Sequence, residues 1–250
     1  MASFQTQIMG LTDLSISSSG TNPTEAQLTQ FLTDGAKEVI NQLPGHLLPL
    51  CASSNTFTSG SAETLVTGKI LNVFRSDGDI NQPCRKIPAK QKGRVSDPEE
   101  MAYATITDPV FFIDNNSLDV LPSGGSCSYS AVAYPAVAYS ASAITAFPNE
   151  AEHLVVLYGA VKSLQNVLAN MDSSIVHSDQ DGSYSASSAS SQGWEKVRDY
   201  IHSDEDVEIS NASLQALSSE MQQFISEYQW REKQQAKLQS DYEKGLQALG

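Results

Sequence analysis

The sequence ITDPVFFIDNNSLDVLPSGG, residues 106–125, leads into SYSAVAYPAVAYSASAI, residues 128–144, and FPNEAEHLVVLYGAVKSLQNVLANM, residues 147–171. The first two segments have the short apolar runs, broken by Gly, Pro, Asn and Asp, that are typical of β-strands. The third repeats apolar residues at helical spacing. The stretch therefore predicts an α+β fold in which a strand block joins one central helix, and nothing in it resembles a reaction centre.

The strand block is expected to be an inserted domain over residues 53–147, antiparallel and either a sandwich or barrel-like. Asn115-Asn116 fits a tight hairpin turn between two of its strands. The near repeat AVAYP and AVAYS is interpreted as a pair of neighbouring strands. The apolar runs predict strands at Thr64–Phe74, Ala102–Thr107, Val110–Asp114, Ser117–Leu121, Tyr129–Tyr134 and Val137–Ala143.

Residues 22–52 and 148–171 are expected to form a helical core, with the central helix spanning about Asn149 to Met171. In the first helix Asn22 is expected to cap, Pro23 to take the first helical position and Glu25 to complete a capping box. Residues 1–21 predict an extended, polar N-terminal arm. Residues 172–209 are Ser-rich and predict a flexible connection.

The last helix is expected over residues 210–250, about 60 Å long if unbroken. Its apolar residues keep a spacing of three and four, which is typical of packing against another helix. Arg231 and Gln235 interrupt this pattern, which indicates that the far half leaves the domain's own core. Two partners fit the spacing equally: another subunit, or the central helix in an intramolecular hairpin. The pattern consists of Leu214, Leu217, Met221, Phe224, Tyr228, Leu238, Tyr242, Gly245 and Leu249.

The chain has 250 residues, a formal net charge of −14 and only 18% charged residues. The acidic balance argues against tight nucleic-acid binding, yet an acidic wall would let DNA slide past without sticking. A weakly charged polar surface suits a protein whose faces meet neighbours, and a solvated acidic protein fits the composition equally. Cys51, Cys84 and Cys127 form no CxxC pair, so reduced thiols and folding in the cytosol are expected. The N-terminal sequence does not resemble a signal peptide, and no stretch has the apolar length of a membrane span.

Basic residues are concentrated in one segment, which holds seven of the fifteen lysines and arginines. We interpret it as a loop that meets the acidic surface of a neighbour. An isolated solvated loop is the alternative, and a nucleic-acid loop would need aromatic residues between the charges. The seven residues are Lys69, Arg75, Arg85, Lys86, Lys90, Lys92 and Arg94.

Catalytic signatures are not apparent in the sequence. The histidines His46, His153, His177 and His202 are not accompanied by a G-x-S-x-G nucleophile motif. Neither a Walker-type loop nor a dinucleotide fingerprint occurs. We therefore expect a non-enzymatic protein with no cofactor and no metal.

The order of these segments resembles the head-to-tail adaptor proteins of tailed bacteriophages, and in layout the tail tubular protein A type of short-tailed phages. The resemblance covers roughly residues 25–170 and part of the last helix. It lies in CRKIPAKQKGRVSDPEEMAYATITDPVFFIDNNSLDVLP, Cys84–Pro122, and in FPNEAEHLVVLYGAVKSL, Phe147–Leu164.

The resemblance implies a virion protein of the neck, assembled in the host cytoplasm as a homo-oligomeric ring, commonly a dodecamer. The ring would contact the portal protein on one side and tail or nozzle proteins on the other, and double-stranded DNA would pass through it without sequence-specific binding. The alternative is a peripheral tail or host-recognition module that uses Tyr129, Tyr134 and Tyr139 of the β domain. The residues expected to contact sister subunits or partners are Arg85, Lys86, Lys90, Lys92, Arg94, Leu217, Met221, Phe224, Tyr228, Leu238 and Tyr242.

Overall fold

The computed structural model describes residues 2–18, 23–65, 69–171, 176–179, 182–185 and 207–249. Side chains are described through residue 171 in the first three ranges. In the last range they are described at residues 215, 218 and 219 and from residue 221 onward.

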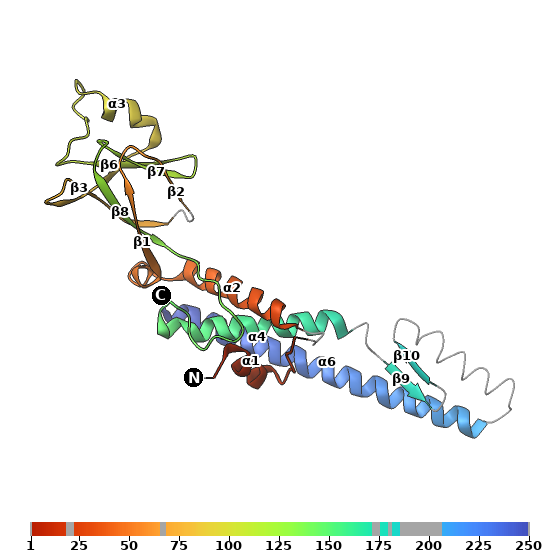
Figure 1. The fold of residues 1–250 in the computed structure, drawn as a ribbon. Helices are drawn as coiled ribbons and strands as arrows, with labels where there is room; N and C mark the ends of the chain where they lie inside the picture. Colours follow the sequence, from red (N-terminus) through yellow and green to blue (C-terminus); the bar gives the residue numbers. More distant parts are fainter. Residues whose placement is uncertain are drawn as a thin grey trace. The chain divides into compact units, whose positions relative to one another are not determined.

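The chain forms an α+β fold of two compact units, drawn in Figure 1, which confirms the predicted class. The first unit comprises Met1–Val39, Ala136–Ala143 and Ala151–Gly250, and the second comprises Ile40–Pro135 and Ile144–Glu150.

In the described part of the chain, the helical unit contains four helices, which pack at close range because glycines lie where they meet. A Cβ on Gly35 would lie 2.8 Å from the Tyr158 ring, and a Cβ on Gly159 would lie 2.9 Å from Ile8. Small residues at such crossings let helix backbones approach closely. The helices are α1 (Phe4–Thr12), α2 (Glu25–Gln42), α4 (Asn149–Met171) and α6 (Val207–Leu249).

The expected extended arm is wrong, since α1 occupies residues 4–12 of it. Ser3 caps this helix by accepting a hydrogen bond from the Thr6 amide at 3.2 Å. Phe4 and Ile8 are almost fully buried one turn apart. A short polar-looking sequence thus becomes helical because one face of it is buried.

The first long helix, α2, begins two residues later than the expected capping pattern places it. Thr24 is the cap: its hydroxyl accepts from the Gln27 amide at 3.2 Å, and the Gln27 side chain accepts from the Thr24 amide at 2.9 Å. This reciprocal pair is a capping box. The predicted cap at Asn22 lies outside the described residues.

The β unit contains two four-stranded sheets, with strand orders β1-β8-β3-β4 and β2-β7-β6-β5. Among the described residues of these sheets, all pairings are antiparallel except the short parallel pair β5–β6, and neither sheet closes into a barrel. The strands are β1 (Ala52–Thr58), β2 (Glu63–Thr64), β3 (Ile70–Ser76), β4 (Asn81–Pro83), β5 (Arg85–Lys86), β6 (Val110–Asp114), β7 (Ser117–Leu121) and β8 (Ser126–Val132). Three short helices accompany them: η1 (Leu48–Cys51), η2 (Ala89–Gln91) and α3 (Lys92–Ser96).

The apolar residues of β6 are buried on both sides of its sheet. Phe111 joins a cluster with Val73 and Tyr129 of the other sheet, so the two sheets form a sandwich. Val110 and Phe112 join a second cluster with Val95 of α3. The continuous apolar run of this strand follows from that double burial.

Two of the predicted strands are confirmed in full, because β6 and β7 have the expected bounds. They are joined at Asn115 and Asn116, whose φ values of 46° and 59° are those of the predicted tight hairpin turn.

Two other predicted strands are wrong. Residues 102–107 form turns instead, in which the Thr105 hydroxyl accepts from the Asp108 amide. Residues 137–143 form no strand, since their backbone bonds to the helical unit: the Val137 amide donates to the Thr33 hydroxyl at 3.1 Å. The AVAYP and AVAYS segments are therefore not neighbouring strands.

Within the Ser-rich connection expected over residues 172–209, β9 (Val176–Asp179) pairs antiparallel with β10 (Gly182–Ser185). The last helix, α6, begins at Val207, three residues before its expected start. The remaining residues of the connection lie outside the described residues.

Candidate functional site

The C-terminal half of α6 packs antiparallel against α4. The rings of Tyr158 and Tyr242 lie 5.9 Å apart. One turn further along, Gly245 lies directly against the side chain of Leu154. The intramolecular hairpin with the central helix, one of the two predicted arrangements, is therefore present in this half.

Leu238 and Tyr242 belong to the core of the helical unit, with exposed fractions of 6% and 8%. Their assignment to a contact with another protein is wrong, because they already contact their own chain. The expectation that the far half of the helix leaves the core is also wrong. Among the described side chains of α6, those just before the polar break at Arg231, residues 221–230, are the more exposed ones.

The α6 helix extends well past the end of α4. Since Tyr158 faces Tyr242 and Leu154 faces Gly245, Met171 at the end of α4 lies level with about residue 229 of α6. At a rise of about 1.5 Å per residue, roughly 30 Å of α6 continues beyond that level. This part of the helix keeps the apolar spacing but lacks α4 as a partner.

Four apolar side chains line one face of this extension, and we call them the distal stripe: Met221, Phe224, Ile225 and Tyr228. Met221, Ile225 and Tyr228 are 57%, 48% and 40% exposed. The ring of Phe224 lies 6.5 Å from that of Tyr228. The spacing of three and four residues puts all of them on one side of the helix. The side chain of Leu217, also predicted for this contact, lies outside the described residues.

Uncharged residues flank the distal stripe, namely Gln222, Gln223, Ser226 and Gln229. Between residues 221 and 229 the one carboxylate is Glu227, which forms an ion pair with Arg231 at 2.7 Å. Charge is depleted in the same way at the centre of protein interfaces. The stripe is therefore suited to contact another protein surface.

A second apolar surface lies between α1 and α4, in an open hollow of about 410 Å³ that we call the α1–α4 hollow. Leu11 stands on it with 37% of its surface exposed. Its lining residues are Gln7, Gly10, Leu11, His153, Val156 and Leu157. Sequence reasoning missed this hollow, because it arises only when two helices distant in sequence pack together.

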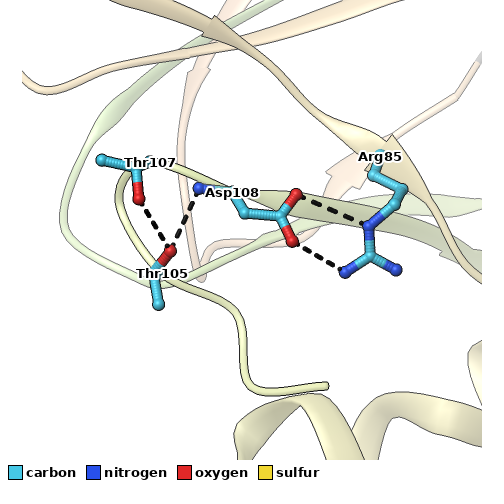
Figure 2. Close-up of polar contacts among 4 residues, drawn as sticks. All are labelled: Arg85, Thr105, Thr107 and Asp108. Atoms are coloured by element: carbon cyan, nitrogen blue, oxygen red, sulfur yellow. Dashed lines mark hydrogen bonds and ion pairs between the residues drawn. The ribbon is translucent and has the colours of Figure 1, made fainter. Parts of the chain in front are cut away.

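Arg85, in the basic segment, forms an ion pair within the β unit. It grips the Asp108 carboxylate through two nitrogens, at 3.0 and 3.5 Å, as Figure 2 shows. The Asp108 amide in turn donates to the Thr105 hydroxyl, which also bonds to that of Thr107. Arg85 therefore ties strand β5 to the loop of residues 105–108.

Two more basic residues are paired in the same way. Arg94 meets Glu100 at 3.1 Å. Lys92 meets Asp119 at 3.6 Å and lies over the Phe112 ring, 5.1 Å from its centre. Of the five basic residues predicted to contact a partner, Lys86 and Lys90 are exposed and form no ion pair within the described part of the chain.

Arg75 is 4% exposed and points into the sandwich, so it contributes nothing to a basic surface. Its Nε donates to the Pro122 carbonyl at 3.0 Å. Gly125 makes room for it, since a Cβ there would lie 2.7 Å from the guanidinium carbon. The interpretation of this residue as part of a basic loop is wrong because the strand register turns it inward, opposite Cys127.

Of the tyrosines proposed as a recognition face, Tyr129 and Tyr134 belong to the β unit and Tyr139 belongs to the helical unit. Tyr129 is buried in the sandwich core, with its ring 5.8 Å from that of Phe57. Tyr134 donates to Asn41 at 2.8 Å, and the Tyr139 amide donates to Thr29 of the helical unit. That role for Tyr129 is therefore wrong.

Burial raises the pKa of Tyr158 and, more strongly, that of Tyr242, and the nearby Glu38 carboxylate acts in the same direction. In the β unit, burial raises the pKa of the Cys84 thiol to about 12. These groups are neutral at pH 7 and serve packing.

No cluster of metal-ligating side chains occurs among the described residues. None of the helices in the described ranges is long and apolar enough to cross a membrane.

No family model matches the chain, and no curated protein matches it either. The functional argument therefore rests on the surfaces described above.

Proposed function

We propose that this chain is a structural virion protein that forms a ring-shaped head-to-tail adaptor between the portal and the tail. The distal stripe carries the proposal. The 43-residue α6 buries Leu238 and Tyr242 in its own unit and leaves Met221, Ile225 and Tyr228 exposed. Water-exposed apolar stripes of this kind mark protein contacts.

The charge distribution supports passage of DNA through such a ring. The net charge of −14 disfavours adhesion to phosphates. Three of the five basic residues in the predicted contact are paired within the chain, which weakens any local attraction to DNA. As part of the same proposal, the protein has no enzymatic role and is located in the virion neck.

The test is assembly of the purified chain, alone and mixed with portal rings, followed by negative-stain microscopy. We expect closed rings, and rings docked on the portal. The variant Met221→Gln/Ile225→Gln/Tyr228→Gln should lose docking or ring formation while keeping the circular dichroism of the native chain. Trp230→Gln is the matched control, because Trp230 is 48% exposed but lies off the stripe. A chain that stays monomeric, with and without portal, contradicts the proposal.

A peripheral tail or host-recognition module is the second candidate. One loop of the β unit favours it: Met101 is fully exposed, and Ile106 and Tyr103 are 48% and 38% exposed. These apolar tips, rather than Tyr129, would form the recognition surface. Binding of the monomer to host cells, lost in Met101→Ser/Ile106→Ser, would support this candidate over the ring.

A further inference from the structure

We propose that the distal stripe of one copy inserts into the α1–α4 hollow of the next copy. The contact rests on the ring proposed above and names the two surfaces that would close it. The stripe and the hollow lie on separate parts of the helical unit, so the contact is heterologous. Heterologous contacts repeat from copy to copy and form a ring when the rotation closes.

The two surfaces are matched in chemistry. Among the residues that line the hollow, Gln7 and His153 are the polar ones, and the rest are apolar or glycine. The stripe offers Met221, Phe224, Ile225 and Tyr228 with uncharged flanks. A second copy is the natural occupant, because one chain supplies both an apolar helix face and an apolar hollow that the described residues leave exposed.

The sizes also agree. A cavity of about 150 Å³ holds one benzene-sized group. The hollow, at about 410 Å³, therefore has room for about two large side chains of the stripe. One face of a helix inserts two neighbouring side chains, such as Ile225 and Tyr228, into such a groove.

The Ile225 side chain does not reach the hollow of its own chain. The Gln234 side chain donates to the Leu11 carbonyl, which fixes the level of α6 beside the hollow. Ile225 lies nine residues earlier on the same helix, roughly 13 Å away along its axis. A second copy is therefore needed to bring an Ile225 side chain to Leu11.

Disulfide trapping tests the contact directly. Leu11→Cys and Ile225→Cys are prepared as separate variants, mixed and oxidised. We expect covalent dimers in the mixture and at least about tenfold less in either variant alone, because only the mixture places a thiol on both surfaces. The native thiols give little background, since Cys51 and Cys127 are buried and Cys84 is half-buried. Gln223→Cys replaces Ile225→Cys in the matched control.

Charge exchange provides the second measurement. Leu11→Lys and Ile225→Glu should each raise the concentration needed for assembly at least about tenfold, because each buries an unpaired charge. The chain carrying both should recover most of that loss, since the lysine of one copy then meets the glutamate of the next. Recovery is specific to contact, because a merely destabilised fold would be worsened by the second change.

The outcomes separate the contact from the ring. Closed rings without trapping or charge rescue overturn the contact and leave the adaptor function standing. Trapped dimers and rescue with only open chains or dimers support the contact and overturn the ring. Absence of both trapping and rings overturns both.

Discussion

The rings of Tyr158 and Tyr242 lie 5.9 Å apart, at an interplanar angle of 60°, and join α4 to the C-terminal half of α6. Tyr242 is buried and Tyr158 is partly buried, and both lie near Glu38 of α2. Three helices therefore meet around one carboxylate and two neutral hydroxyl groups.

This arrangement predicts a loss of stability in alkali. In the unfolded chain a tyrosine ionises at a pKa of about 10. The folded-state pKa of Tyr242 is raised, so the folded chain keeps a proton that the unfolded chain loses. The stabilisation is complete below about pH 10 and is lost as the pH rises above it. Urea unfolding between pH 8 and 11 should show this loss, and Tyr242→Phe should show less of it. If the free energy of unfolding falls equally steeply with pH in the native chain and in Tyr242→Phe, Tyr242 is not the source of the loss.

Close helix packing at Gly35 predicts opposite effects for two identical substitutions. Gly35→Ala places a Cβ 2.8 Å from the Tyr158 ring and should lower the free energy of unfolding by about 1–3 kcal/mol. Gly10→Ala in α1 meets nothing within 4 Å and should raise it by up to about 1 kcal/mol. Thermal or urea unfolding measures both. If Gly35→Ala leaves the free energy of unfolding unchanged, α2 and α4 can move apart to accommodate the added methyl group at little cost.

Cys84 should react slowly with iodoacetamide in the folded chain. Its pKa of about 12 leaves about one thiol in ten thousand ionised at pH 8, against roughly a quarter for a free cysteine. Labelling should therefore be on the order of a thousandfold slower than in the urea-unfolded chain, which serves as control. Mass spectrometry of the modified peptides gives the rates. Labelling at the free-cysteine rate would show that the sandwich opens there.

The basic segment predicts unequal effects of charge removal on partner binding. Lys86→Gln/Lys90→Gln should weaken binding to an acidic partner surface and reduce its salt dependence, because these two lysines have no ion pair among the described residues. Arg94→Gln is the control, since its charge is already matched by Glu100. Sedimentation of mixtures at about 50 and about 300 mM salt, between which the Debye length falls from roughly 14 to roughly 6 Å, separates the two cases. If Arg94→Gln weakens partner binding more than Lys86→Gln/Lys90→Gln does, the two lysines are not the residues that contact the partner.

Local pattern predicted the elements whose partners lie close in sequence. The hairpin at Asn115-Asn116 and the helix over 149–171 are examples, because turn residues and helical spacing determine them directly. The helix at residues 4–12 was missed although Ser3, Phe4 and Ile8 carried its cap and buried face. Its polar surroundings hid a short periodic pattern.

Tertiary contacts decided the remaining elements. Residues 137–143 have strand propensity. The amides of this segment nevertheless donate to the hydroxyls of Thr29 and Thr33, and not to a neighbouring strand. The spacing of α6 predicted a packed face along the whole helix. The half of α6 that packs inside the chain is determined by the end of α4 and by the close approach of Gly245 to Leu154. The spacing of apolar residues in α6 does not contain this information.

Burial of β6 on both faces has a consequence for how the β unit unfolds. Phe111 ties the strand to the facing sheet, while Val110 and Phe112 tie it to the loop that carries α3. Neither layer can detach without exposing this strand, so the two clusters are expected to melt together as one cooperative block. The amides of β6 would then exchange with deuterium only through global opening of the β unit.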